Sequence, residues 1–493
     1  MAESVSDGRA GQSGGTDPSR FSAAALGVLY VLFCLGPLGL ALTRRAAPAG
    51  PWEYAAAGLG LAGLGAMAAQ FVTSGRFRIV SRHLGIDKIM AFHKIAAWWV
   101  LVALMLHPLA YVVPTWLENP GLGVERFEAY LTLPRYRSGL IALAALALLA
   151  ATSVLRDRLP WRYELWRASH VILALAAVGG GLHHAVAAGR FSPMGAVQGF
   201  WWGVGGAVVA VMAVLYGWRW LRLRLQPWRL ASVTKRADRL WELDIQPAPG
   251  TRPLGYRAGQ FVWMTEGTRR FPLFDHPFSL ADSPLRPGLS LIVKEAGDFT
   301  RRIGSLAPGT PIGIDGPHGD FTLEDHEGES ILLLAGGVGI APIMGLLRDL
   351  AARRDPRPIR LAYAAGQPEN FACLPEIEAA RSRLDLQVTL LSEEGGPGWN
   401  GSVGRLDRGR LERMLEGLDP ARSVALICGP GPMVTAISDR LLDLGMTMER
   451  VIYERFDYSD GGASRQDRRR RRRFLGIGAA LTLGVALFAT LLS

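Results

Sequence analysis

The sequence predicts a multi-domain membrane protein. An all-α six-helix transmembrane bundle is followed by an antiparallel β-barrel domain, an α/β domain and a seventh transmembrane helix at the C-terminus. Within residues 21–227, six apolar stretches are each about 20 residues long, enough to cross a hydrocarbon layer of about 30 Å. Residues 228–325 alternate short strand-like runs with turn residues, and residues 326–458 alternate strands with helices. Residues 474–493 form one more apolar stretch.

Composition agrees with a membrane protein. Of 493 residues, 49% are hydrophobic and 20% are charged, which excludes a disordered chain and a simple soluble enzyme. The net charge of +11 is compatible with nucleic acid, but many arginines flank apolar stretches, so we expect a lipid bilayer as partner and no nucleic acid. The cysteines Cys34, Cys373 and Cys428 are too few and too scattered for a disulfide framework, a zinc site or a ferredoxin-type cluster.

The predicted spans define a domain of residues 21–227. They lie at 21–43, 53–74, 90–114, 136–155, 168–188 and 196–218. Residues 1–20 are rich in Gly and Ser, so we expect a disordered cytoplasmic tail. They lack the basic start of a signal peptide, and the first span is therefore expected to stay in the protein.

The distribution of basic residues predicts the orientation. With the N-terminus inside, twelve Lys and Arg residues flank the cytoplasmic ends of the spans and six flank the outer ends, as the positive-inside rule requires. We therefore expect a multi-pass protein of the cell (plasma or inner) membrane, with the N-terminus and residues 228–458 in the cytoplasm. The inner set is Arg76, Arg78, Arg82, Lys88, Arg156, Arg158, Arg162, Arg167, Arg219, Arg222, Arg224 and Arg229; the outer set is Arg44, Arg45, Arg126, Arg135, Arg137 and Arg190.

The C-terminal segment carries a second orientation signal. A basic linker at 459–473 contains six consecutive arginines, Arg468 to Arg473, and directly precedes the apolar residues 474–493. A basic run next to an apolar stretch of this length is typical of the cytoplasmic end of a transmembrane helix. We therefore expect the soluble part of the chain to be attached to the membrane at both of its ends.

Histidines within two of the predicted spans are candidate metal ligands. The third span contains His93 and His107, and the fifth contains His170 with His183 and His184. Ionisable residues inside a membrane are costly and usually functional. A separation of fourteen residues places two imidazoles about 21 Å apart along a helix and on the same face.

Two parallel helices with such pairs can hold two flat macrocycles, one near each membrane face. His93 is expected to face His170 near the cytoplasm, and His107 to face His183 or His184 near the outside. Haem with two imidazole ligands suits one-electron transfer, whereas these histidines are too far apart for zinc. Helical phase favours His184, while a bulge at Gly179–Gly181 would bring His183 into position.

Two motifs in the β-rich part can bind a flavin nucleotide. His276-Pro277-Phe278-Ser279 offers an aromatic face for a flat ring and a hydroxyl for a ring nitrogen. Further on, Lys294, Gly297 and Thr300 supply a cation, a turn and a helix start suited to a pyrophosphate.

The α/β part contains two loops suited to a nucleotide. The buried strand Ile331–Ala335 is followed by Gly336, Gly337, Val338, Gly339 and Pro342, although the spacing is not that of the G-x-G-x-x-G fingerprint. The strand Val424–Ile427 leads into Cys428, Gly429 and Pro430. Ligands bind at such carboxyl strand ends, so Cys428 is expected to line the pocket rather than act as a nucleophile.

Together these residues resemble the ferredoxin–NADP reductase-like flavoproteins, and residues 53–456 resemble the ferric reductase and NADPH oxidase superfamily. The resemblance implies FAD on His276–Ser279, with Ser279 near the reactive nitrogen, and on Lys294 and Thr300. It implies NADPH or NADH on Gly336–Pro342 and Cys428–Pro430. Glu454-Arg455-Phe456 is similar to a closing segment whose aromatic ring shields the flavin, so Ser279, Cys428 and Phe456 are the candidate catalytic residues. The resemblance favours His183 over His184 as the outer haem ligand.

The resemblance implies an NAD(P)H-dependent flavohaem oxidoreductase that passes electrons through FAD and two b-type haems to an extracytoplasmic acceptor. Ferric chelate and dioxygen are both candidate acceptors, as in ferric reductases and superoxide-generating NADPH oxidases. The alternative is an electron-input module for one extracytoplasmic protein partner. Gly366-Gln367-Pro368 stands where relatives often carry an arginine, which leaves NADPH and NADH open.

Overall fold

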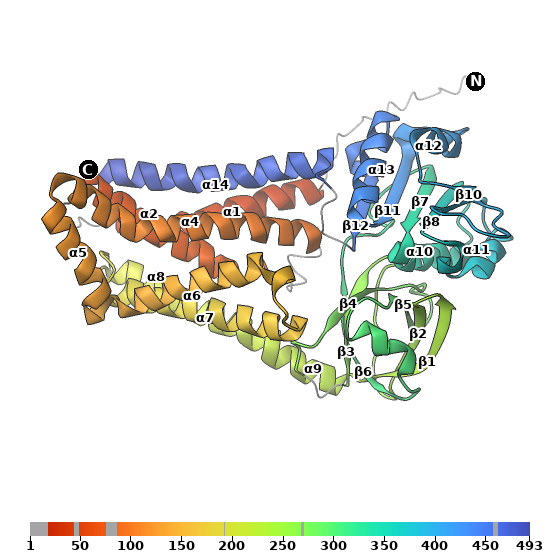
Figure 1. Ribbon diagram of the computed structural model, residues 1–493, viewed down its shortest axis with the longest axis horizontal. Helices are drawn as coiled ribbons and strands as arrows, with labels where there is room; N and C mark the ends of the chain where they lie inside the picture. The colour runs from red at the N-terminus through yellow and green to blue at the C-terminus, as the bar shows by residue number, and fades with distance from the viewer. Residues whose placement is uncertain (1–17, 44–48, 75–85, 192, 268–270, 457–461) are drawn as a thin grey trace, which may run out of the picture.

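The computed structural model describes residues 18–43, 49–74, 86–191, 193–267, 271–456 and 462–493. Residues 1–17 of the expected tail lie outside this part of the chain. A long helical bundle carries two sheet domains at one of its ends (Figure 1). Five arginines used to predict the orientation also lie outside the described residues: Arg44, Arg45, Arg76, Arg78 and Arg82.

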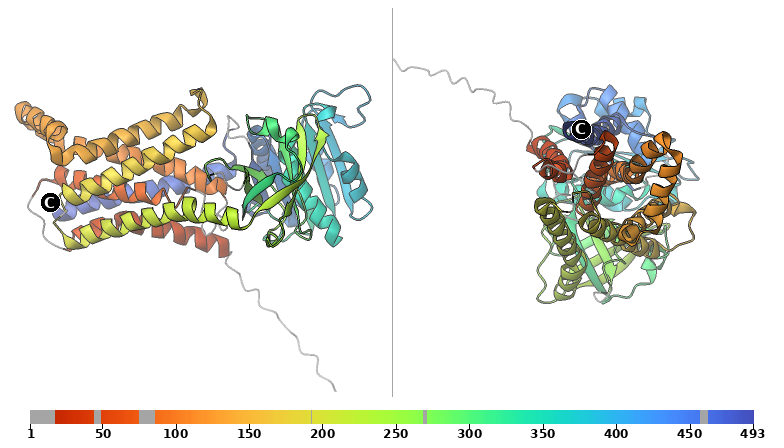
Figure 2. Two further views of the ribbon diagram at one scale, coloured as in Figure 1. Left: turned by 90° about the horizontal axis from the view of Figure 1, so that it is seen from below. Right: turned by 90° about the vertical axis from the view of Figure 1, so that its left-hand side faces the viewer.

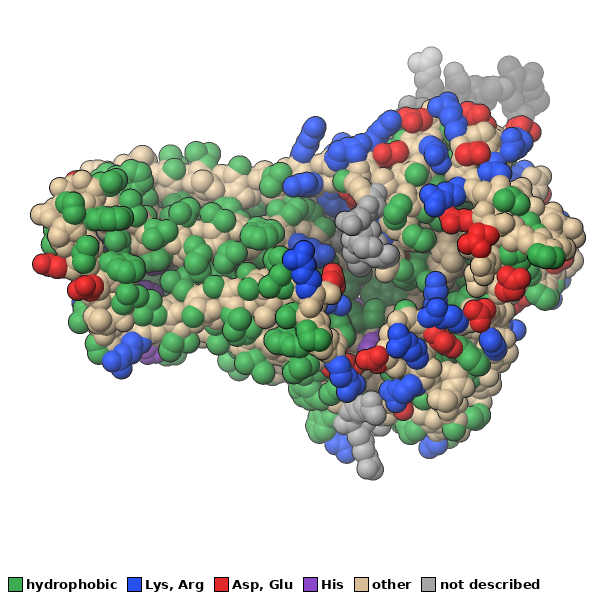
Figure 3. Space-filling view, in the orientation of Figure 1, with side chains coloured by type: hydrophobic (Ala, Val, Ile, Leu, Met, Phe, Trp, Pro, Cys, Tyr) green, Lys and Arg blue, Asp and Glu red, His purple; other side chains and the backbone are tan. Residues whose placement is uncertain are grey.

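The helical bundle accounts for the apolar half of the chain. Among the described residues, six helices are long and apolar enough to cross a membrane. Large apolar side chains such as Leu32, Trp98 and Leu106 are exposed on its outside, and Figure 3 shows hydrophobic side chains along most of one face. The bundle helices are α1 (Pro18–Ala41), α2 (Pro51–Ala69), α4 (Ile86–Glu118), α6 (Arg137–Val154), α7 (Tyr163–Ala187), α8 (Gly195–Met212) with its continuation through a π-helical turn (Ala213–Trp218) into α9 (Arg219–Leu225), and α14 (Arg465–Leu492).

The helix α2 differs from the span expected at 53–74. It lies inside the bundle against α1, α4 and α14, and it is not among the six candidate membrane-crossing helices of the described residues. Its first turn, Pro51-Trp52-Glu53-Tyr54, is polar and shortens the apolar stretch. The rest is mainly Ala and Gly, which allows close packing between helices. The six candidates therefore include the C-terminal helix α14 instead.

One short helix lies across the end of the bundle that is remote from the sheets. This helix, α5 (Pro120–Thr132), begins directly after α4 and is capped by Asn119, whose side chain accepts from the backbone N–H of Leu122 at 3.2 Å (Figures 1 and 2). Arg126 of α5 pairs with Glu53 of α2 at 2.6 Å. The hydrogen bonds of α5 thus fix the turn that reverses the chain between α4 and α6.

The first sheet is antiparallel, with six strands in the order β4-β3-β6-β1-β2-β5. Leu280, directly after β4, forms an isolated β-bridge with Leu291 of β5, the strand at the opposite edge of the sheet. Alternating apolar side chains from both halves of the sheet, among them Leu243, Val262 and Ile312, form its core. The strands are β1 (Trp228–Ala237), β2 (Leu240–Pro247), β3 (Phe261–Glu266), β4 (His276–Ser279), β5 (Leu289–Lys294) and β6 (Pro311–His318).

The second sheet is parallel, in the order β10-β9-β8-β7-β11-β12. All residues of β7 and β11 are buried, as expected for strands covered by helices on both faces. From β7 the chain continues to β8, β9 and β10 on one side of the sheet, and from β11 it continues to β12 on the other side. The carboxyl ends of β7 and β11 therefore form the topological switch point, where such sheets bind ligands. The elements are β7 (Ser330–Gly336), α10 (Ile340–Arg353), β8 (Ile359–Ala365), α11 (Leu374–Ala380), β9 (Leu386–Ser392), β10 (Ser402–Val403), α12 (Arg408–Leu415), β11 (Ser423–Gly429), α13 (Gly431–Asp443) and β12 (Val451–Arg455).

The two sheet domains are joined by a shared core and by buried charges. Arg348 of α10 donates to Glu242 of β2 at 2.7 Å and to Glu376 of α11 at 2.7 Å. Burial alone raises the pKa of Glu242, but the hydrogen bonds and charge of Arg348 with the hydroxyl of Ser290 outweigh it, so this pKa lies below its ordinary value. These contacts hold the two domains as one module at the end of the bundle.

Candidate functional site

One cavity of about 480 Å³ connects the helical bundle with the sheet domains. Its bundle end contains His93 of α4 and His170 of α7, two of the predicted metal ligands. Its other end contains Pro277, Phe278 and Ser279 of β4 together with Phe456, which follows β12. Its walls between these ends are largely apolar and include Met90, Val100, Leu149, Trp166, Val171, Leu215 and Trp263.

The inner histidines are arranged as ligands to a buried group. Nδ1 of His170 lies 3.2 Å from the hydroxyl oxygen of Ser153, so Nε2 is left for a ligand. Within the described residues, Nδ1 of His93 is buried without a hydrogen-bond partner. A buried imidazole normally finds such a partner, and His93 also lines the cavity, so its ring is a candidate ligand to a bound group.

The outer histidines meet near the far end of the same helices. The rings of His107 and His184 have centroids 6.4 Å apart. Nδ1 of His107 lies 2.7 Å from the carbonyl oxygen of Ala56, which fixes this nitrogen as the donor and leaves Nε2 free. Glycines make room for both rings: a Cβ on Gly60 meets the His107 ring at 2.7 Å, and a Cβ on Gly139 meets the His184 ring at 2.9 Å.

His183 points elsewhere. Its side chain is exposed, and its Nδ1 lies 3.0 Å from the hydroxyl oxygen of Ser138 on α6. The helix α7 continues unbroken through Gly179–Gly181, so the bulge that would turn His183 inward is not present in this described segment. The structure therefore brings together His93 with His170 and His107 with His184, as helical phase predicts, and leaves the predicted ligand His183 outside the second pair.

The predicted flavin motif lies on β4 and on the turn after β5. The His276 ring stacks on Phe299 with centroids 4.3 Å apart, and Ser279 is buried. Burial lowers the pKa of His276, although Glu164, 3.9 Å away, opposes this change. The hydroxyl oxygen of Thr300 accepts from the backbone N–H groups of Ala296 and Gly297 at 2.8 and 2.9 Å.

The two nucleotide loops meet at the switch point. Ala335 pairs with Cys428 across β7 and β11, so Gly336–Pro342 and Cys428–Pro430 leave the sheet side by side. The backbone of Gly339 approaches the Cys428 carbonyl so closely that a Cβ has no room, and Gly337 has a φ of +55°. Cys428 is fully buried and is not among the residues that line the cavity of about 480 Å³, so its lining role stays a prediction.

The closing segment lies beside these loops. Glu454 pairs with Cys428 and Arg455 with Gly429 in the register of β11 and β12. Phe456 follows directly and lines the same cavity as Ser279. Of the candidate flavin ligands, Lys294 is exposed at the end of β5, outside the residues that line the cavity.

A buried charge cluster that the motif analysis did not identify lies between the bundle and β4. Asp275, next to His276, forms ion pairs with Arg167 of α7 and with Arg219 of α9, the latter at 2.6 Å. Arg219 also pairs with Asp315 of β6 at 2.6 Å. Arg167 lies three residues before His170, so the cluster links the inner histidine helix to the flavin motif. Basic side chains gather around this junction in Figure 3.

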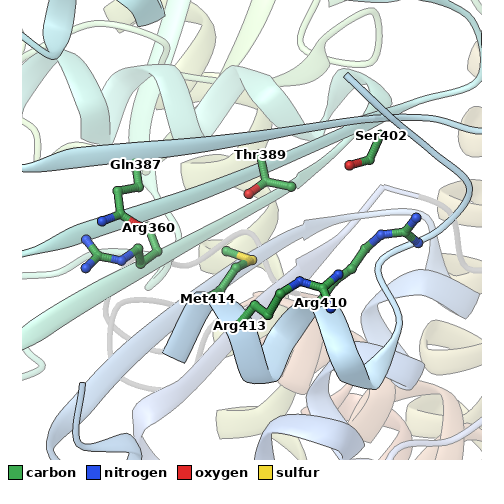
Figure 4. Close-up of a pocket in the computed structure, with 7 residues that line it drawn as sticks. All are labelled: Arg360, Gln387, Thr389, Ser402, Arg410, Arg413 and Met414. Carbon is green, nitrogen blue, oxygen red and sulfur yellow. The ribbon is translucent and has the colours of Figure 1, made fainter. Parts of the chain in front are cut away.

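A second cavity, of about 230 Å³, lies between the parallel sheet and α12 (Figure 4). Arg360, near the start of β8, and Arg410 of α12 contribute charge to it. Arg410 already donates to the carbonyl oxygen of Val403 at 2.8 Å and to Asp407 at 3.1 Å. The second cavity is thus separate from the carboxyl strand ends and from the cavity that contains the histidines.

The residues present fit the expected cofactors. The two histidine pairs, the outer one with glycines beside both rings, suit two haems with bis-imidazole ligation, and no cluster of three or more His, Cys, Asp or Glu side chains suited to a metal occurs in the described residues. The β4 motif with Thr300 suits FAD, and the glycine loops at the switch point suit a nicotinamide nucleotide.

Comparison with known proteins gives three family matches in chain order. Residues 59–181 match the family described as ferric reductase like transmembrane component, residues 229–319 match the FAD-binding domain, and residues 333–439 match the oxidoreductase NAD-binding domain. All three matches fall on the elements that carry the histidine pairs, the β4 motif and the glycine loops.

Individual relatives match the sheet domains. A flavohemoprotein of Bordetella pertussis is 29% identical over 251 residues, which cover 46% of this chain and 60% of the relative. The sulfhydrogenase 2 subunit gamma of Pyrococcus furiosus is 31% identical over 210 residues, which cover 40% of this chain and 70% of the relative. The flavohem-like FAD/NAD binding domain of nitric oxide dioxygenase from Vibrio cholerae is 18% identical with a TM-score of 0.41, covering 47% of this chain and 98% of that domain.

The order of the three family matches, together with the apolar helices, defines the architecture. The transmembrane match precedes an FAD-binding match, which precedes an NAD-binding match, in a multi-pass membrane protein. The chain therefore belongs to the oxidoreductases that join a ferric reductase-like transmembrane component to FAD-binding and NAD-binding domains, the architecture of ferric reductases and NADPH oxidases.

Proposed function

We propose that the protein passes electrons from cytoplasmic NAD(P)H, through FAD and two haems, to an acceptor on the other side of the membrane. The observation that carries the proposal is the single cavity lined by His93 and His170 at one end and by Phe278, Ser279 and Phe456 at the other. The residues proposed to bind the two cofactors line one space with largely apolar walls, which supports the proposal.

When bound, FAD converts a hydride donor into a source of single electrons, and bis-histidine haem exchanges single electrons without an open iron position. The chain's own residues hold and orient these groups. His93 with His170 and His107 with His184 are the proposed ligand pairs, with ring orientations set by Ser153 and Ala56. The apolar walls exclude water from the space between the inner pair and the flavin motif.

The remaining residues position the flavin and the nucleotide. Ser279 presents a buried hydroxyl to the ring, and Phe456 covers the cavity on the side of the nucleotide loops. The backbone at Gly336–Gly339 approaches a phosphate without side-chain hindrance, and the N-terminus of α10 adds its dipole. Lys294, exposed beside Gly297 and Thr300, is placed to meet the pyrophosphate from solvent.

The proposed orientation places both sheet domains in the cytoplasm. The basic side chains Lys88, Arg167 and Arg219 pair with acids of the sheet domains and Arg156 lines the shared cavity, so all four lie at the bundle end that carries these domains, in agreement with the positive-inside rule. The C-terminal helix α14 begins at this end and finishes at the other (Figure 1).

The acceptor is proposed to be a ferric chelate or dioxygen. A haem held by both His107 and His184 would leave no site for the acceptor at the iron, so its electrons would pass by outer-sphere transfer, which both substrates permit. Exposed acids at the outer end, Glu118, Glu125 and Glu128, favour the approach of a cationic acceptor.

The experiment that tests the acceptor uses the purified protein after anaerobic reduction by NAD(P)H. Rapid reoxidation of the haem by ferric citrate, or by air with formation of superoxide, identifies one of the two small acceptors. Rapid haem reduction followed by slow reoxidation with both would contradict them and favour the electron-input module for an extracytoplasmic protein.

A further inference from the structure

The C-terminal helix α14 begins inside the nucleotide-binding domain. The hydroxyl oxygen of Ser464 accepts from the backbone N–H of Asp467 at 3.2 Å, while the Asp467 carboxylate accepts from the backbone N–H of Ser464 at 3.0 Å. This reciprocal capping box fixes where the helix starts and how the Asp467 side chain points.

The carboxylate of Asp467 also binds two side chains of β12. It accepts from the Tyr453 hydroxyl at 2.7 Å and from Nη2 of Arg455 at 2.7 Å. The same Nη2 donates to the hydroxyl oxygen of Thr435 on α13 at 3.0 Å. Asp467 and Arg455 are both mostly buried, with side chains 20% and 17% exposed, so solvent screens this pair less than a surface ion pair.

The strand end held in this way is the closing segment. Arg455 is the β-sheet neighbour of Gly429 in the nucleotide loop, and Phe456 lines the same cavity as Ser279. A nicotinamide nucleotide that reaches the flavin motif from the Cys428–Pro430 loop must therefore pass Arg455 and Phe456.

The rest of α14 is anchored in the bundle. Phe474 packs on Phe92 of α4 with ring centroids 5.2 Å apart, and the Trp99 indole N–H donates to Thr482 at 3.1 Å. Further along, a Cβ on Gly58 of α2 meets Val485 at 3.1 Å. The helix that holds Asp467 is thus fixed relative to the histidine helices, and the ion pair connects the closing segment to the membrane domain.

We propose that Asp467 is a positioning residue for nucleotide binding. Its carboxylate holds the Arg455 side chain, and through Arg455 it fixes the end of β12, so that Phe456 keeps its place in the wall of the cavity next to the Cys428–Pro430 loop. The inference rests on the proposed function, since it assigns the part of the cavity at Phe456 to the nicotinamide nucleotide.

The test compares Asp467→Asn with wild type in the full-length, detergent-purified protein loaded with FAD and haem. Asn keeps an oxygen for the cap at Ser464 but loses the charge that binds Arg455. The KM for NAD(P)H in ferricyanide reduction is expected to rise about tenfold, the scale of one lost hydrogen bond to a charged group. The kcat is expected to stay the same, because the substitution loosens the nucleotide site of the free enzyme and not that of the enzyme with bound nucleotide.

The matched control is Asp443→Asn. It removes the exposed pair of Asp443 with Arg465, 2.7 Å apart, which also joins α13 to α14 but does not reach β12. The KM of this variant is expected to equal that of wild type. An equal rise in both variants would mean that any contact to α14 matters and would overturn the assignment to Asp467.

A double-mutant cycle with Arg455→Gln tests whether Asp467 acts through Arg455. If it does, Asp467→Asn adds no further rise in KM to Arg455→Gln. If Asp467→Asn does not accumulate as a folded haem protein, Arg455→Gln alone must show the same rise. An unchanged KM in either folded variant contradicts the proposal, whereas wild type that NAD(P)H cannot reduce contradicts the proposed function itself.

Discussion

Two adjacent histidines of α7 have opposite surroundings. His184 faces His107 at a ring distance of 6.4 Å, while His183 is exposed and lies beside Ser138. A helix rotates each residue by about 100°, so neighbouring side chains cannot both reach the same partner. Helical phase from the sequence is enough to favour His184, whereas the family resemblance favours His183, and the geometry supports the phase argument.

We therefore predict that His184→Ala loses the outer haem and His183→Ala keeps it. Haem content per protein is expected to fall by about half in His184→Ala, because bis-imidazole ligation needs both members of the pair. Quantification as the pyridine haemochrome against protein concentration measures this. If His183→Ala loses haem and His184→Ala does not, α7 rotates about its axis when haem is bound, so that His183 is the ligand.

A second prediction at this scale concerns the choice between NADH and NADPH. At the carboxyl end of β8, the side-chain amide of Gln367 donates to Glu394 at 2.8 Å. An acid at such a strand end suits a ribose hydroxyl and repels a 2′-phosphate. Glu394→Arg is expected to raise kcat/KM for NADPH relative to NADH by about tenfold, through a charge-assisted contact to phosphate. If the ratio of kcat/KM for NADPH to that for NADH is unchanged in steady-state assays, the 2′ position of the ribose does not lie near Glu394.

At the scale of elements, the charge cluster around Asp275 sets how β4 sits on the bundle. Asp275 is 1% exposed and binds Arg167 of α7 and Arg219 of α9. Because it precedes His276 directly, its removal shifts the flavin motif relative to His170. Removing one partner of a buried ion pair costs about 3–5 kcal/mol, which is enough to loosen this contact.

Asp275→Asn is accordingly expected to slow electron transfer from flavin to haem by about tenfold or more, the scale of an ångström-level misplacement. Reduction of the flavin by NAD(P)H should not change. Stopped-flow absorbance at flavin and Soret wavelengths separates the two steps. The control is Asp320→Asn, which breaks the half-exposed pair with Lys88 of α4, and equal slowing in both variants would argue against a specific role for Asp275.

The contact between the two sheet domains depends on pH through Glu242. The pKa of Glu242 is lower in the folded protein than its value of about 4.3 in the unfolded chain. The charged carboxylate therefore stabilises the folded module fully above the unfolded pKa, and this stabilisation is lost as the pH falls through the pKa of the folded protein. At pH 7, Glu242→Gln is expected to lower the free energy of unfolding of this module by about 1.5–3 kcal/mol. Thermal unfolding followed by flavin fluorescence should show this difference shrink as the pH falls below the unfolded pKa and vanish below the pKa of Glu242 in the folded protein. A difference that persists in acid would mean that packing is responsible.

Most elements of the fold could be predicted from local patterns. The buried strands β7 and β11, the glycine loops and the phase of the histidines are each encoded within about 20 consecutive residues. The stretch expected to span at 53–74 is not among the six candidate membrane-crossing helices of the described residues, since Glu53 and its neighbours lower the hydropathy at the start of α2. The cluster around Asp275 was not predictable, since Arg167 and Arg219 lie far from Asp275 in the sequence. The partners of Asp467 are near it in the sequence, but a single acid beside arginines has no distinctive pattern.

At the scale of the whole molecule, the proposed cofactor sites form one path. The nucleotide loops adjoin the closing segment, which shares a cavity with the flavin motif and the inner histidines. The outer pair lies further along the same two helices, α4 and α7. This continuity is what the proposed transmembrane electron transfer requires.

The most direct test is an anaerobic visible spectrum of the detergent-purified protein with FAD, before and after addition of NADH or NADPH. A shift of the Soret band and a sharp α band on addition of the nucleotide are the predicted result. A haem spectrum that dithionite changes and neither nucleotide changes would contradict the account.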